Sequence, residues 1–315
     1  MDQNSRLSWS SFSLYEKCPQ QFLWRYGWDR IDVGHGPGVK KPVPVVRSRH
    51  AAVMGIVIQA VVEDMYSNEL YRLGEALSDK LSDLVLHHWK KEVRNPRNFI
   101  DIREAGMSEG EMIGVCQDGV LGYLKTMKEH RLLGAYTKAE VELVGWIDKW
   151  LCVWGFADLI VRRDDTGVTI IDGKNTAHKM KYTDPDQLRW YAMLFKLSYG
   201  ESPDRLGFVW YRFPHGDKYN DPETGELKTE TGVEWVEFTD EDLKGLALRA
   251  QEARAGMRRE KFEPKPTPEG CRWCDYLTVC EARQAQIVSN GGGKARPKAQ
   301  LEELAESAGF SDFSM

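Results

Sequence analysis

The spacing of apolar residues in the first 135 positions is typical of α-helices. Tyr15, Cys18 and Phe22 recur three or four positions apart, which predicts a short aromatic helix over residues 8–28. The stretch 32–46 is rich in Gly and Pro and predicts a loop. Helical periodicity then returns three times, at residues 50–72, 76–92 and 108–131.

Beyond residue 138 the pattern changes to that of β-strands. Residues 139–176 are rich in β-branched and aromatic residues and contain two turn signals, which predicts three consecutive antiparallel strands. A helix should follow, with Asp184 as its N-cap and Pro185 at its first position. The further predicted elements are helix 184–199, strand 205–213, loop 214–232, strand 232–238 and helix 240–260.

Composition and charge narrow the class of protein. The chain has 315 residues, of which 42% are hydrophobic and 29% charged, so we expect a folded soluble protein. No apolar run reaches the roughly 18 residues of a membrane helix, and the N-terminal segment lacks a signal peptide, which predicts a cytoplasmic location without membrane partners. The net charge of −5 excludes a protein that is basic all over, but local basic patches remain.

The cysteines fall into two groups. Cys116 and Cys152 lie in apolar segments and are predicted to be ordinary buried thiols. Near the end of the chain, the stretch CRWCDYLTVC follows a Pro-rich loop and has C-x2-C-x5-C spacing, which is typical of metal ligands. With a fourth thiolate, such a set suits either a zinc ion or an iron–sulfur cluster.

Two aspartates and a lysine are the candidate site residues of the predicted strand region. Asp172 and Lys174 are two residues apart on one predicted strand, so their side chains share a face. If the preceding turn is centred on Asp165, paired residue numbers sum to 330, and Asp158 falls opposite Asp172. Two carboxylates about 4.5–5.5 Å apart at Cβ favour a bound Mg²⁺ or Mn²⁺. The alternative, for a bare D-x-K pattern, is a surface ion pair.

The motifs GFADLIV, IDGKNT and QLRWY, in that order, resemble the PD-(D/E)XK nuclease superfamily, and most closely its RecB-like branch. The resemblance implies an α/β restriction-endonuclease-like core, with a mixed central sheet flanked by helices and a helical insertion. It also implies that Asp158 and Asp172 bind the metal ion, with the Gly173 carbonyl completing the shell. Lys174 would be catalytic, and Gln187 and Tyr191 would support the site and contact DNA.

One position departs from the family pattern. The first core helix of the family carries a G-x-x-x-H motif whose histidine supports the metal site, and here the corresponding stretch is GIVIQ. Gln59 therefore stands where the family has histidine. Its amide oxygen is a further candidate ligand, although an amide binds less tightly than an imidazole.

The same resemblance supplies a fourth cysteine. The stretch WSSFSLYEKCPQQF resembles the N-terminal segment of the iron–sulfur members of the branch, in which this cysteine joins the C-terminal three. The implied [4Fe–4S] ligands are Cys18, Cys271, Cys274 and Cys280, and the cluster would join the two ends of the chain. The implied segments are an N-terminal helix 1–31, a linker, first core helix and insertion 32–135, a nuclease core 136–262, a cysteine segment 263–285, and a linker and acidic tail 286–315.

The function implied is a metal-dependent DNA exonuclease, acting on DNA ends or single strands in recombination, repair or phage DNA processing. Rings such as Trp190 and Tyr191 would stack on bases; core packing is the alternative for both and is favoured for Trp190. No P-loop motif is present, so any motor would be a separate partner. Two other hypotheses are a non-catalytic DNA-binding or assembly subunit, whose acidic tail binds a protein partner, and a zinc-stabilised protein without a nucleic-acid role.

Overall fold

The chain divides into two compact units. Unit 1 comprises Met1–Phe12 and Val46–Arg258, and unit 2 comprises Ser13–Val45 and Arg259–Met315. The division of the chain into five segments and the binding of a protein partner by the acidic tail stay predictions. The tail, residues 286–315, lies outside the described residues. The computed structural model describes residues 6–29, 31, 40–45, 47–73, 77–133, 136–176, 179, 183–221, 224–272 and 274–283.

Unit 1 is built on a mixed six-stranded sheet. Strand β2 pairs antiparallel with nearly the whole of β3, so β1 and β4 share the other edge of β3, β1 along its first half and β4 along its second. Beyond β4 come β5, which is parallel to it, and β8, which is antiparallel to β5. The strands are β1 (Arg6–Ser8), β2 (Tyr136–Asp148), β3 (Leu151–Arg163), β4 (Gly167–Lys174), β5 (Arg205–Trp210) and β8 (Val233–Val236).

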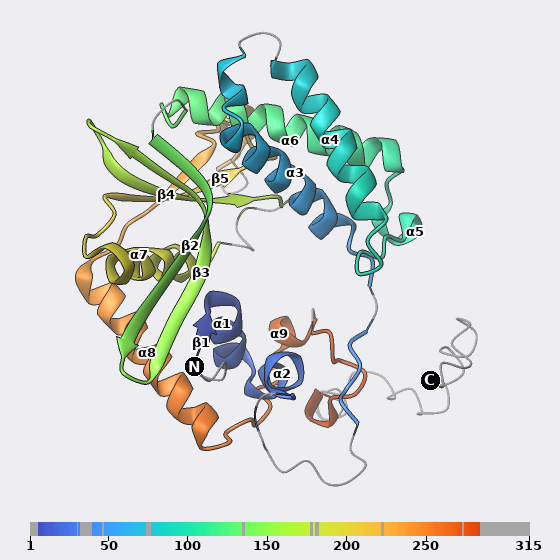
Figure 1. Ribbon diagram of the computed structural model, residues 1–315. Coiled ribbons are helices and arrows are strands. Elements are labelled where there is room, and N and C mark those ends of the chain that lie inside the picture. Colours follow the sequence, from blue (N-terminus) through green and yellow to red (C-terminus); the bar gives the residue numbers. More distant parts are fainter. Residues whose placement is uncertain are drawn as a thin grey trace. The chain divides into compact units, whose positions relative to one another are not determined.

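Helices cover both faces of this sheet (Figure 1). One layer consists of α3, α4 and α6 with the short α5, and the other of α7 and α8. No helix in the described ranges is both long and apolar enough to span a membrane. The helices of the two layers are α3 (His50–Ser67), α4 (Leu77–Val93), α5 (Ile102–Ala105), α6 (Glu109–Glu129), α7 (Pro185–Tyr199) and α8 (Asp240–Arg258).

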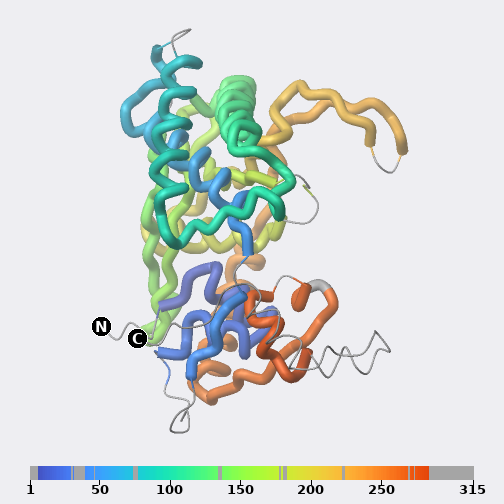
Figure 2. Tube along the Cα trace, turned by 90° about the vertical axis from the view of Figure 1, so that its right-hand side faces the viewer, coloured from blue at the N-terminus to red at the C-terminus, as the bar shows by residue number. Residues whose placement is uncertain are grey.

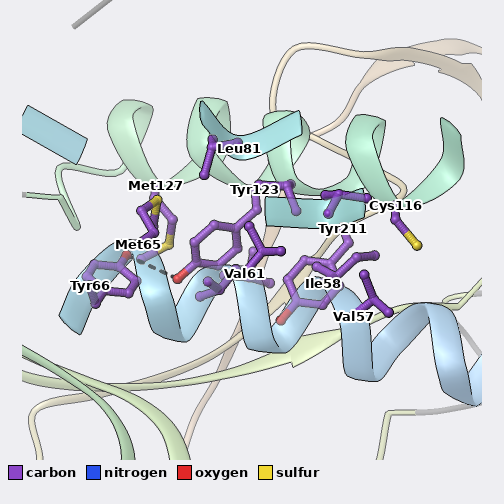
Figure 3. Close-up of a cluster of buried hydrophobic side chains, with 14 of the residues drawn as sticks. Val57, Ile58, Val61, Met65, Tyr66, Leu81, Cys116, Tyr123, Met127 and Tyr211 are labelled. Carbon is purple, nitrogen blue, oxygen red and sulfur yellow. Dashed lines mark hydrogen bonds between the residues drawn. The ribbon is translucent and has the colours of Figure 1, made fainter. Parts of the chain in front are cut away.

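The main core of unit 1 lies among α3, α4 and α6 and continues onto β3, β4 and β5; Figure 3 shows its part between α3 and α6. Apolar residues of α3, such as Val57, Ile58 and Val61, are fully buried against α6 and the strands, as their helical spacing predicts. The buried hydroxyls of Tyr66 and Tyr123 lie 3.1 Å apart and satisfy each other. This rigid packing fixes α3 against the end of β4 and thereby positions the candidate site.

The β3–β4 hairpin has the predicted register. Five pairs, from Leu159 with Ile171 to Arg163 with Gly167, have residue numbers that sum to 330. Gly167 has a φ of 66°, a conformation that favours glycine, and it closes the turn. The predicted loop 214–232 contains a further hairpin, β6 (Lys218–Asn220) with β7 (Leu227–Thr229), which projects from unit 1 (Figure 2).

The prediction of one helix over residues 8–28 is wrong in one respect. The helix breaks at Cys18, whose backbone is extended with φ −158° and ψ 100°. The reason is Pro19, because a proline disfavours the helical conformation of the residue before it and starts a new helix well. The three resulting pieces are α1 (Trp9–Lys17), α2 (Pro19–Phe22) and a π-helical turn (Leu23–Gly27).

Unit 2 has a small aromatic core. Phe22 stacks on Phe262 with ring centroids 6.4 Å apart, and the Tyr15 hydroxyl donates to the Lys261 carbonyl at 2.9 Å. Among the described apolar residues of this unit, the best buried side chain, Tyr276, is still 4% exposed. So small a core gives limited stability by itself.

Candidate active site

The candidate site lies where β3 and β4 separate. Their pairing ends at Leu159 and Ile171, so Asp158 and Asp172 are the first residues beyond the last pair. The two strands stay connected there by a hydrogen bond in which the Gly173 amide donates to Asp158 Oδ2 at 2.8 Å. Asp158 also lines an open cavity of about 440 Å³ together with residues of α3. The structure thus brings the two predicted aspartates together.

Asp172, Lys174 and Gln187 form a closed polar triangle. Lys174 Nζ lies 2.5 Å from Asp172 Oδ2 and donates to Gln187 Oε1 at 2.8 Å. Gln187 Nε2 donates in turn to Asp172 Oδ1 at 2.9 Å. Gln187 lies in the first turn of α7, which begins as predicted with Asp184 as N-cap, its side chain accepting from the Asp186 amide.

The burial of the triangle excludes a surface ion pair. The side chain of Asp172 is 3% exposed and that of Lys174 is 18% exposed. Taking two such charges out of water is costly unless their polar atoms find partners. Gln187 supplies two hydrogen bonds, whereas buried Asp172 Oδ2 has the ion pair with Lys174 but no hydrogen bond among the described residues. The arrangement holds the ammonium group of Lys174 in one place beside the carboxylates.

The expected stacking of Trp190 and Tyr191 on bases is not compatible with their burial. Trp190 is fully buried and stacks on Phe12 with centroids 5.1 Å apart. Tyr191 is 8% exposed and packs against Gly155, where an added Cβ would lie 3.2 Å from its ring. Both rings are core residues, because α7 is buried at every position from Trp190 to Phe195.

The electrostatics of the site favour a bound cation. Burial raises the pKa of Asp158, and the neighbouring charge of Asp172 raises it further. Burial also raises the pKa of Asp172, although Lys174 lowers it. Two carboxylates whose ionised forms are disfavoured by burial and mutual repulsion are stabilised by a divalent cation, and hard oxygen donors suit Mg²⁺ or Mn²⁺. The residues present therefore fit the implied metal ion.

Gln59 lies near the site, but its amide has protein partners. Gln59 Nε2 donates to Glu140 Oε1 at 2.7 Å, and the Tyr211 hydroxyl donates to Gln59 Oε1, also at 2.7 Å. Neither Glu140 nor Tyr211 was a sequence-predicted site residue. A signal for Glu140 existed, because a hairpin turn near Lys149 places it opposite Asp158.

Gly173 is required by the close approach of Tyr211. A Cβ on Gly173 would lie 1.9 Å from the Tyr211 hydroxyl oxygen, and Tyr211 is itself only 3% exposed. Gly173→Ala should therefore displace the ring, break its hydrogen bond to Gln59 and lower the free energy of unfolding by about 1–3 kcal/mol. Urea denaturation measures this loss. Gly245→Ala is the matched control, since nothing lies within 4 Å of its added Cβ; equal loss in both variants would contradict the account.

The four predicted cysteines gather in unit 2. They line one cavity between α2 and α9 (Pro268–Arg272), two helices from opposite ends of the chain that lie together in Figure 1. None of the four forms a disulfide, and the Tyr276 amide donates to Cys274 Sγ at 3.4 Å. Burial raises the pKa of Cys274, and the other three thiols raise it further. In the described ranges, no three His, Cys, Asp or Glu side chains are arranged closely enough to hold a single metal ion.

The remaining cysteines behave as predicted. Cys116 is fully buried and Cys152 is 2% exposed, so both are core thiols of unit 1, and neither lines the cavity of unit 2. Burial raises the pKa of Cys116 to about 12, which keeps it a neutral thiol.

Comparison with known proteins agrees with this geometry. The model of the PD-(D/E)XK nuclease superfamily matches residues 6–281. No curated protein matches the sequence. Among solved structures, one described as "Crystal structure of SSO0001" is similar at 15% sequence identity with a TM-score of 0.33, over 76% of this chain and 89% of that chain. The family match covers both units, and the chain belongs to the PD-(D/E)XK nuclease superfamily, which implies a metal-dependent nuclease.

Proposed function

We propose that this protein is a Mg²⁺- or Mn²⁺-dependent exonuclease that hydrolyses phosphodiester bonds at DNA ends or in single strands, in recombination, repair or phage DNA processing. The observation that carries the proposal is the convergence of Asp158, Asp172 and Lys174 where β3 and β4 separate. Two carboxylates and a fixed ammonium group at one point are what phosphodiester hydrolysis requires.

The chain's own residues have distinct roles in this proposal. Asp158 and Asp172 would hold the divalent ion, with the Gly173 carbonyl as a further ligand. When bound, the ion polarises the phosphate and lowers the pKa of a bound water. Lys174, held by Asp172 and Gln187, presents its positive charge to the anionic transition state and orients the attacking water. Gln187 is a positioning residue, because it contacts Lys174 and Asp172 and fixes both.

We further propose that Cys18, Cys271, Cys274 and Cys280 hold a [4Fe–4S] cluster in unit 2. Their gathering around one cavity, without any disulfide, supports this assignment. The small core of the unit also supports it, because a bound metal centre contributes folding free energy that such a core lacks. Zinc is the alternative occupant, and a colourless protein that contains zinc and no iron would establish it.

The exonuclease assignment predicts that cleavage requires a free DNA end, so linear and circular DNA are compared. The full-length protein, purified without oxygen, is incubated with Mn²⁺ and end-labelled linear single- and double-stranded DNA. A covalently closed circle of the same sequence is included. Linear DNA should be degraded to short products while the circle persists. Cutting of the circle at the same rate would show an endonuclease, and binding of linear DNA without any cleavage would favour the assembly subunit.

A further inference from the structure

We propose that Glu140 becomes a third carboxylate ligand when a divalent ion binds at Asp158 and Asp172, and that Gln59 positions it. In this structure, these three described carboxylates are not yet arranged closely enough to hold an ion. Gln59 would then not be a substitute ligand in the place where relatives carry histidine. This inference rests on the proposed function, since it assumes a divalent ion at Asp158 and Asp172. It assigns a metal-binding role to a residue of β2 that no motif marks.

The position of Glu140 in the sheet points at the site. Ala139 pairs with Leu159 and Val141 pairs with Ala157, so Glu140 lies opposite Asp158 across the β2–β3 ladder. Glu140 itself does not pair, and its φ is 48°, the left-handed region that a glutamate rarely adopts. Such a conformation is strained and is kept only where the surrounding structure holds it.

A chain of hydrogen bonds holds the Glu140 side chain from α3. The Tyr211 hydroxyl donates to Gln59 Oε1, and Gln59 Nε2 donates to Glu140 Oε1. The direction of this chain is fixed, because a carboxylate only accepts hydrogen bonds and must face the amide nitrogen. Tyr211 is anchored in turn against Gly173, the residue between Asp172 and Lys174. The position of Glu140 is thus tied to the strand end that carries the predicted ligands.

The chemistry of the two residues fits this division of roles. A glutamate is a negatively charged, hard oxygen donor, and Mg²⁺ and Mn²⁺ prefer such ligands. An amide oxygen is neutral and already accepts from Tyr211 in this structure. The half-buried Gln59 lines the same cavity as Asp158 and Glu63, so its own place is at the wall of the site. A residue that orients a ligand typically changes metal affinity by about 10–100-fold when it is lost.

The test measures Mn²⁺ binding to the full-length protein by titration calorimetry. Glu140→Gln keeps the size of the side chain and removes its charge, and it should weaken Mn²⁺ binding about tenfold or more. Gln59→Leu should weaken binding about tenfold, and by less than Glu140→Gln, because Glu140 remains but loses its orientation. The matched control is Glu142→Gln, two residues along the same strand, exposed and opposite Phe156, which should bind Mn²⁺ like the wild type.

Melting temperatures recorded without metal separate a binding role from a structural one. If Glu140→Gln lost Mn²⁺ affinity with an unchanged melting temperature, the metal role would be established. If Glu140→Gln bound Mn²⁺ like the wild type while Asp172→Asn did not, the inference would be overturned and the proposed function would stand. If the wild type bound Mn²⁺ but did not cleave DNA, that result would count against the proposed function alone. The role of Glu140 would still be decided, because it is measured by comparing the Mn²⁺ affinities of Glu140→Gln and the wild type.

Discussion

Replacing Lys174 with methionine should lower the rate of DNA cleavage by about 10³-fold, the size of effect expected for a group that stabilises charge in the transition state. The change also leaves the 3% exposed carboxylate of Asp172 without its cation. An uncompensated buried charge lowers the free energy of unfolding by about 3 kcal/mol. Mn²⁺ should restore most of that stability, because it replaces the lost positive charge, but it should not restore the rate. Initial rates on end-labelled DNA and melting curves with and without Mn²⁺ measure both effects.

The matched control for this variant is Lys196→Met. Lys196 lies on α7, is 41% exposed and pairs with Asp240 at the surface, so its loss should change neither rate nor stability appreciably. If Lys174→Met retained wild-type cleavage, Lys174 would not be catalytic. If Mn²⁺ restored its rate together with its stability, the role of Lys174 would be structural only.

Cys18→Ala should release the proposed iron–sulfur cluster and unfold unit 2. Cys18 is the N-terminal member of the four thiols that line the cavity, and the break of the helix at Pro19 presents it there. Because the apolar core of the unit is small, loss of the cluster should remove the main source of its stability. Iron content per chain and visible absorbance should fall to near zero, and residues around Phe22 and Phe262 should become accessible to limited proteolysis.

Cys116→Ala is the control for the loss of a thiol. Cys116 is fully buried in unit 1, so its replacement leaves a small cavity but should leave the iron content unchanged. Equal iron in Cys18→Ala and in the wild type would remove Cys18 from the ligand set. Full iron loss in Cys116→Ala as well would show that the assay reports general unfolding and would contradict the assignment of separate thiol groups.

The chemistry on the β3–β4 hairpin was predictable because it depends on local geometry. A turn near Asp165 fixes the register of a two-stranded hairpin, and the register alone places Asp158 next to Asp172. Gln187 followed from its helix motif. The hydrogen-bond partners of the Gln187 amide could not be predicted, because they depend on how α7 docks on β4.

The hairpin turn near Lys149 places Glu140 opposite Asp158, but the contacts that Glu140 and Tyr211 make with Gln59 could not be predicted in the same way. Gln59 and Glu140 are 81 residues apart, and Gln59 and Tyr211 are 152 apart, so their contacts depend on the packing of α3 against the sheet. The left-handed backbone of Glu140 has no signature in the sequence, since glycine is the residue expected at such a φ. Core packing was the favoured alternative for Trp190 from the sequence, but for Tyr191 it was not decided, because helical periodicity marks an apolar face without saying what covers it.

The most direct test of the central claim compares wild type, Asp172→Asn and Asp165→Asn on end-labelled linear DNA with Mn²⁺ and with EDTA. Asp172→Asn removes a buried charge at the site, whereas Asp165→Asn makes the same change in the exposed turn of the same hairpin. The account predicts Mn²⁺-dependent degradation by wild type and Asp165→Asn, and none by Asp172→Asn. Degradation that persists in EDTA, or that is equal in all three proteins, would contradict it.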